Sequence, residues 1–271
     1  MITRRTFLKY TGATALTWYA VNEFGVLQAI AQIPGGTLDP AAVPKFQTPL
    51  LVPPVMPKAG TLVQRGKNVD YYEISMKQIM QQILPAGMPG TTVWGYGAVS
   101  AESKRGLLVH NAPSLTIEAK WNTPVRVKWI NDLKDDNGSF RPHLLPVDPT
   151  LHWANPGGGR NGRDMRPNFT GKTYVPIQSF SDSATQYTQY VGPVPIVTHV
   201  HGAVGVGDES DGYAEAWYLP DANNIAPDFA VEGTWYEFFK SKAASNFGAE
   251  WGPGFATFQY PNRNRASTIW Y

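Results

Sequence analysis

The sequence contains no cysteine and only five histidines in 271 residues. Without a thiol the chain can form no disulfide bond and can offer no thiolate ligand to a metal ion. Charged residues make up only 16% of the chain, with Lys and Arg at 23 against Asp and Glu at 21. This near balance, without a basic cluster, gives no electrostatic reason to bind nucleic acid or an anionic membrane surface.

A long uninterrupted apolar run is also missing. The best candidate, residues 11–31, is broken by Asn22 and Glu23, so we expect no membrane span. The segment follows paired arginines, Arg4 and Arg5, and ends in a small-x-small cleavage pattern at 29–31. This order resembles a twin-arginine export signal, with an ordinary N-terminal helix as the alternative. The resemblance implies that residues 1–31 direct the protein to the periplasm or the cell exterior.

Glycine and proline are plentiful, at 26 and 23 residues, and fall in turn-like clusters between short β-branched and aromatic runs. This pattern favours many short strands, so the fold class we expect is all-β. Alternating apolar and polar residues predict strands over 70–76, 91–97, 113–121 and 125–131, with later candidates over 195–201, 233–239 and 267–271. Residues 32–60 are predicted to form an extended arm, and 61–271 a single domain with long loops, notably 153–191.

Two of the strand candidates show one apolar face each. In the first, alternate positions share an apolar face: Leu115, Ile117, Ala119 and Trp121. In the second, Val125, Val127 and Trp129 share a face, with Arg126 and Lys128 opposite. Burial of one face and exposure of the other is typical of a β-sandwich.

His199 and His201 stand one residue apart in the stretch PIVTHVHG, ahead of an acidic, glycine-rich loop. If this stretch is a strand, alternate side chains point the same way, so the two imidazoles share a face and Val200 points to the opposite layer. Such a pair can hold one metal ion or two neighbouring ions, and imidazole suits copper, zinc, iron and nickel. A structural histidine pair without metal, or a mononuclear zinc site for hydrolysis, are the alternatives.

An ordered set of stretches resembles the multicopper oxidases, in particular the spore-coat laccase and bilirubin oxidase branch. The stretches cover the chain from about residue 71 to its end: YYEI and a following Met76, WGY at 94–96, PSLTIE at 113–118, PVRVKW at 124–129, LPVDPTLH at 145–152, THVHG at 198–202, SDGY at 210–213 with EAW at 215–217, YPN at 260–262 and TIWY at 268–271.

The resemblance implies a cupredoxin-like Greek-key β-sandwich that is the first domain of such an oxidase. It also implies that His199 is a ligand to the type 2 copper, His201 a ligand to one of the paired type 3 coppers, and Asp211 a proton donor for dioxygen reduction. Asp211 before Gly212 also suits an Asx turn, and the two roles are compatible. The implied reaction couples one-electron oxidation of phenols, pigments or metal ions to four-electron reduction of dioxygen to water.

The sequence also departs from the family pattern. In the family, a stretch like 268–271 runs into a second His-x-His, whereas this sequence stops there, and the type 1 copper site needs a cysteine that the sequence lacks. We therefore expect a fragment that needs C-terminal cupredoxin domains and is inactive by itself. A copper-free exported scaffold is the alternative function. Of the other histidines, His152 is predicted to support the loop near the coppers and His143 to be solvated.

Overall fold

The computed structural model describes residues 20–22, 25–27, 38–50, 52–99, 110–147, 154–169, 173–176 and 188–271. The chain divides into two compact units, Met1–Val43 and Pro44–Tyr271. In the first unit, β1 (Ala20–Asn22) pairs antiparallel with β2 (Gly25–Leu27), and a 3-10 helix, η1, spans Pro40–Ala42. Most of the export signal predicted at 1–31 lies outside the described residues. No helix among the described residues is long and apolar enough to cross a membrane.

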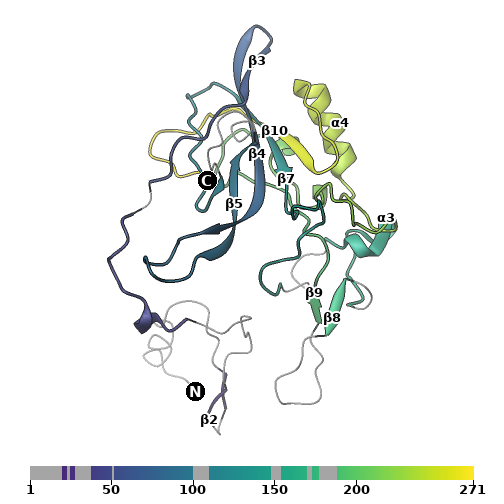
Figure 1. The fold of residues 1–271 in the computed structure, drawn as a ribbon. Helices are drawn as coiled ribbons and strands as arrows, with labels where there is room; N and C mark the ends of the chain where they lie inside the picture. The colour runs from purple at the N-terminus through teal and green to yellow at the C-terminus, as the bar shows by residue number, and fades with distance from the viewer. Residues whose placement is uncertain are drawn as a thin grey trace, which may run out of the picture. The chain divides into compact units, whose positions relative to one another are not determined.

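The second unit is built on one six-stranded sheet (Figure 1). Its strands are β3 (Gly60–Gln64), β4 (Lys67–Gln81), β5 (Thr91–Ala98), β6 (His110–Asn111), β7 (Val125–Asn131) and β10 (Phe255–Tyr260). The order is β10-β7-β4-β5-β6, and β3 pairs with the beginning of the long β4. All neighbours are antiparallel except β4 and β7, which run parallel. The strands predicted at 70–76, 91–97 and 125–131 are confirmed.

One face of this sheet carries the core. Tyr72 and Ile74 of β4 are paired in register with Val127 and Trp129 of β7, and all four are buried. The facing layer consists of extended segments joined by single bridges, such as Ile196 to Tyr218 and Tyr218 to Glu232, instead of continuous ladders. The Tyr218 hydroxyl donates to the main-chain oxygen of Trp129 at 3.0 Å, which ties the two layers together. The chain is therefore an all-β, cupredoxin-like sandwich, as predicted, and its sheets do not close.

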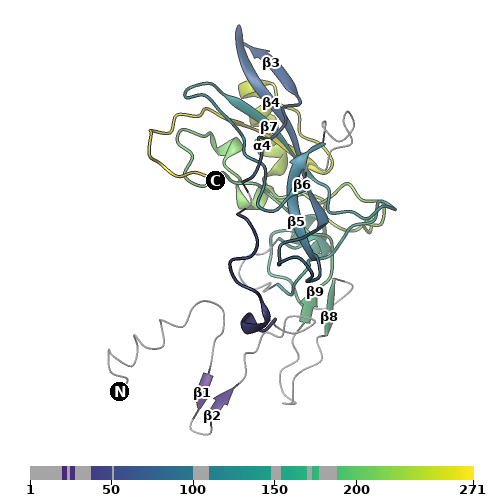
Figure 2. The ribbon, with the colours of Figure 1, turned by 60° about the vertical axis from the view of Figure 1, so that its left-hand side comes forward.

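The remaining elements lie in the long connections. They are η2 (Pro156–Gly158), α3 (Gly159–Gly162), the paired strands β8 (Tyr174–Pro176) and β9 (Thr188–Tyr190), η3 (Asp208–Ser210) and η4 (Ala214–Ala216). In Figure 2, β8 and β9 lie below the six-stranded sheet. The predicted loop 153–191 thus has short elements of its own where it is described.

The strand predicted at 233–239 is wrong, because this region begins a twelve-residue helix, α4 (Tyr236–Phe247). Its buried residues are Tyr236, Phe239, Ala243 and Phe247, spaced three and four residues apart as one face of a helix requires. Gly248 ends the helix in the left-handed conformation, with φ of 68°. The helix packs beside the edge strand β10 (Figure 1) and covers it.

The prediction of a solvated face on β7 is wrong for Arg126, which is only 8% exposed. The guanidinium donates to the main-chain oxygen of Phe247 at 2.5 Å and to Gln259 Oε1 at 2.9 Å. It also lies 5.1 Å from the centre of the Phe247 ring. Arg126 therefore occupies the C-terminal end of α4, where unpaired carbonyl oxygens and the helix dipole favour a cation.

Two further strand predictions fail because no ladder forms. In 113–121 only Thr116 makes a bridge, and along the predicted face Leu115 is buried but Trp121 is 73% exposed. Residues 267–271 form no strand but lie against the histidine segment described below. His143, predicted to be solvated, instead packs with ring centres 5.5 Å from Trp94 and 6.0 Å from Tyr190.

Candidate metal centre

His199 and His201 lie just beyond the bridge between Ile196 and Tyr218. The two main chains exchange hydrogen bonds there at 3.0 and 2.9 Å, and no ladder continues through the histidines. The prediction of a strand through residue 201 is therefore wrong after Ile196. The chain turns at His201 and Gly202, because Gly202 has φ of +81° and the Ile269 carbonyl oxygen would lie 2.8 Å from a Cβ placed there.

The side chains of residues 199–201 alternate in direction as predicted, although no β-ladder forms there. Val200 packs against the core cluster, whereas His199 and His201 are both exposed. The two imidazole rings have centres 6.0 Å apart and planes at 85° to each other. Two ring nitrogens can thus be directed into a shared space from one short segment.

Asp211 holds the ring of His199 through its main chain. The Asp211 carbonyl oxygen lies 2.5 Å from Nδ1 of His199, and because a carbonyl can only accept, Nδ1 carries the proton. The lone pair of the neutral ring then lies on Nε2, which is the nitrogen left for a metal ion. The Asp211 carboxylate Oδ1 is 3.5 Å from the same Nδ1, and its side chain is 53% exposed.

The loop that presents Asp211 is held by both neighbouring elements. The main-chain N–H of Gln259 on β10 donates to Ser210 Oγ at 3.0 Å. Lys242 of α4 forms an ion pair with Asp208 and lies 3.9 Å from Glu209 Oε2. The hydrogen bond from Lys242 keeps the pKa of Asp208 below its ordinary value. The loop carries acidic side chains close to the histidine pair, and the ion pair between Asp208 and Lys242 anchors the loop to α4.

Gly212 is the tightest point of this loop. Its φ is +81°, a region that side chains other than glycine seldom adopt, and a Cβ there would overlap the carbonyl oxygen of Thr198. The absence of a side chain lets the loop approach the residue just before His199. The contact between Asp211 and His199 depends on this approach.

His201 is positioned from the other side by the end of the sequence. Its main chain exchanges two hydrogen bonds with Tyr271, at 2.8 and 3.2 Å. The His201 and Tyr271 rings stack with centres 5.0 Å apart and planes at 28°. Each histidine therefore has its own support.

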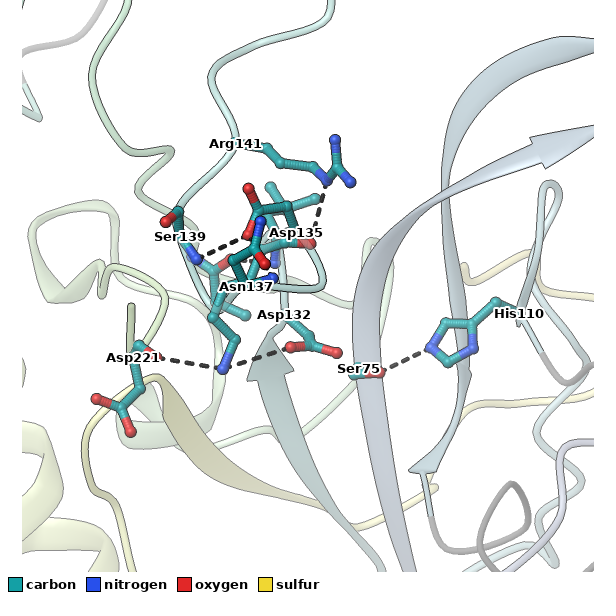
Figure 3. Close-up of polar contacts among 11 residues, drawn as sticks. Ser75, His110, Asp132, Asp135, Asn137, Ser139, Arg141 and Asp221 are labelled. Atoms are coloured by element: carbon teal, nitrogen blue, oxygen red, sulfur yellow. Dashed lines mark hydrogen bonds and ion pairs between the residues drawn. The ribbon is translucent and has the colours of Figure 1, made fainter. Parts of the chain in front are cut away.

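Beside His199 lies a pocket of about 410 Å³, lined by His199, Asp208, Asp211, Gly212, Tyr213 and Ala214. Nowhere in the described ranges do three or more His, Cys, Asp or Glu side chains gather closely enough to hold a metal ion. His152 lies outside the described residues. His110, on β6, is buried with Nε2 2.7 Å from Ser75 Oγ of β4, inside the sheet (Figure 3).

Sequence reasoning selected the two histidines and Asp211 but missed their supports. Lys242 was missed because α4 was not predicted, and its partner Asp208 lies 34 residues away in the sequence. Tyr271 was interpreted only as the end of a strand. Gly212 carried a readable signal, since an Asp-Gly pair in a loop often places glycine at positive φ.

Comparisons with known proteins find laccases and another multicopper oxidase. The chain is 29% identical over 209 residues to the laccase of Bacillus subtilis (strain 168), which covers 77% of this chain and 26% of that protein. It is 26% identical over 216 residues to the laccase of Bacillus stratosphericus, covering 80% and 27%. It is 30% identical over 186 residues to multicopper oxidase LPR1 homolog 3 of Oryza sativa subsp. japonica, covering 68% and 21%. The chain thus spans about a quarter of the length of these relatives. No protein-family model matches it.

The close approach at Gly212 can be tested by a matched pair of glycine substitutions. Gly212→Ala should lower the free energy of unfolding by ~3 kcal/mol, because the new methyl group meets the Thr198 carbonyl oxygen. Gly66→Ala has a similar positive φ but nothing within 4 Å, so its cost should be only ~1 kcal/mol of backbone strain. Urea unfolding of both variants measures the difference. Equal costs would show that the loop does not press against Thr198.

Proposed function

Since this chain belongs to the multicopper oxidase family through its cupredoxin domain, we propose that His199 binds a type 2 copper and His201 one copper of a type 3 pair. The observation that carries the proposal is the hydrogen bond from His199 Nδ1 to the Asp211 carbonyl, which leaves Nε2 as the ring nitrogen that can bind a metal ion. The His199 side chain is 46% exposed, so a metal ion can reach Nε2.

The residues present fit copper in their chemistry. Copper is bound well by neutral imidazole, both imidazoles here are exposed, and His199 lines a pocket that also carries Asp208 and Asp211. A histidine that binds a metal usually donates its other ring N–H to a carbonyl or carboxylate, as His199 does. When bound, copper supplies the one-electron chemistry that no side chain can perform.

Asp211 has a second role in this proposal. Its main-chain oxygen orients His199, while its carboxylate, 53% exposed, stays in contact with solvent next to the same ring. A carboxyl group in this place lies between solvent and the histidine pair, where a general acid can pass protons inward. We assign to Asp211 the delivery of protons to dioxygen as it is reduced.

The activity of the whole protein is a proposal as well. We infer that it couples one-electron oxidation of a small reducing substrate, a phenol, a pigment or a metal ion, to four-electron reduction of dioxygen to water. The 271 residues contain no cysteine for a type 1 site, so we assign electron entry to further cupredoxin domains. Oxygen-electrode measurements with a phenolic substrate should show no turnover by this chain alone, and steady consumption would contradict this division of roles.

The proposed ligands can be tested by titration of the full chain with Cu²⁺ in a calorimeter. His199→Ala and His201→Ala should each weaken copper binding about tenfold or more, because each removes an imidazole nitrogen. His143→Gln is the control, since this histidine packs among Trp94 and Tyr190 instead of the site. Equal binding by the wild type and both alanine variants would mean that the pair is not a copper site.

We also propose export by the twin-arginine route, from the order of motifs in residues 1–31. A fusion of these residues to a folded reporter should reach the periplasm. Replacing Arg4 and Arg5 together by lysine keeps the charge and should retain the reporter in the cytoplasm, whereas Lys9→Arg should not. Export of the double variant at the wild-type level would refute the assignment.

A further inference from the structure

A second pocket, which we call the α4 pocket, lies beside the first half of helix α4. It has a volume of about 470 Å³ and is enclosed by the loop after Tyr218, the first half of α4 and the turn at 252–254. This volume is typical of small-molecule sites. The α4 pocket shares no residue with the pocket beside His199.

The wall of the α4 pocket combines apolar side chains with charged ones. Side chains without charge make up most of it, among them Leu219, Ile225, Phe229 and Val231. Leu219 is buried, Ile225 and Phe229 are half-buried, and Val231 is 53% exposed at the surface. An apolar ligand body could therefore replace water along this wall with a gain in free energy.

One carboxylate in this wall, that of Glu232, is partly withdrawn from solvent. Glu232 is half-buried, and its place is fixed by the bridge to Tyr218 and by the main-chain hydrogen bond from Gly233 to Trp217 at 2.8 Å. Throughout the part of the chain that the structure describes, its carboxylate makes no hydrogen bond or ion pair. Burial, and next the nearby Glu237, raise the pKa of Glu232, whereas Lys240, Arg163 and Arg160 act in the opposite direction.

The other charges of the wall do not neutralise Glu232. Lys240 is 2.8 Å from Glu237 Oε1 and is paired with that carboxylate. Asp221 accepts from Lys134 only through its main-chain oxygen, at 3.2 Å (Figure 3), so its side-chain charge remains. The lining thus carries three acidic residues and one lysine, a formal charge of −2. Arg160 and Arg163 stand outside the lining.

We propose that the α4 pocket binds a small organic ammonium ion, with its N–H groups on the Glu232 carboxylate and its apolar body against Ile225, Phe229 and Val231. A metal cation would need several converging oxygen ligands, and nowhere in the described residues do three His, Cys, Asp or Glu side chains gather closely enough to supply them. A neutral or anionic ligand would cover the half-buried Glu232 carboxylate without offering it a positively charged partner. The site requires no copper and does not rest on the proposed oxidase function.

The test uses the full chain and three phenyl compounds of similar size, observed by saturation-transfer NMR. The ammonium compound 2-phenylethylamine should bind, whereas neutral 2-phenylethanol and anionic phenylacetate should bind at least about tenfold more weakly, because they lack the charge-assisted hydrogen bond. Equal binding of amine and alcohol, or no binding of the amine at millimolar concentration, would overturn the proposal.

Two pocket variants, Glu232→Gln and Val231→Lys, and one control, Glu118→Gln, locate the site. Glu232→Gln keeps the shape of the side chain and should weaken amine binding about tenfold. Glu118→Gln removes one negative charge from an exposed position outside the pocket and should leave the affinity unchanged. Val231→Lys, at an exposed position, places a cation at the entrance and should also reduce amine binding. Wild-type affinity in both pocket variants would show that the amine binds elsewhere or unspecifically.

Discussion

The hydrogen bond from His199 Nδ1 to the Asp211 carbonyl is the contact on which the histidine site depends. It decides which nitrogen of His199 can bind a metal ion and in which direction the ring points. A main-chain carbonyl is well suited to this task, because it accepts a hydrogen bond but is not itself protonated in the working range of pH. The contact in turn needs Gly212, whose missing side chain lets the loop reach Thr198.

The rest of the unit places this loop. The sheet fixes β10, whose Gln259 N–H holds Ser210, and α4 holds Asp208 through Lys242. Arg126 of β7 in turn caps the end of α4, so the helix is joined to the sheet at its last turn. A helix in an otherwise all-β domain therefore has a definite role here. It covers the edge strand β10, anchors the acidic loop and provides one wall of the α4 pocket.

The sequence predicted the sheet better than the segments that carry the site. Strands β4, β5 and β7 were recognised because their sequences are rich in β-branched and aromatic residues and tend to alternate between apolar and polar. Helix α4 was missed although Tyr236, Phe239, Ala243 and Phe247 show helical spacing, because the aromatic run at 235–239 also suits a strand. Arg126 was assigned to solvent because nothing local reveals the helix end that covers it.

The sequence predicted the local pattern of the site but not its tertiary contacts. The alternation of His199, Val200 and His201 held, since it depends only on an extended main chain. The stacking of Tyr271 on His201 and the ion pair of Lys242 with Asp208 join residues far apart in the sequence. Such contacts follow from packing, which periodicity does not encode.

The central claim is that Asp211 fixes His199 with its proton on Nδ1, and long-range ¹H–¹⁵N NMR of the imidazole side chains tests it most directly. The spectrum of the metal-free full chain, with His199→Ala used to identify the signals, shows which ring nitrogen is protonated. We predict a single neutral form of His199 protonated at Nδ1. A ring protonated at Nε2, or a rapid mixture of both forms as in free histidine, would contradict the account.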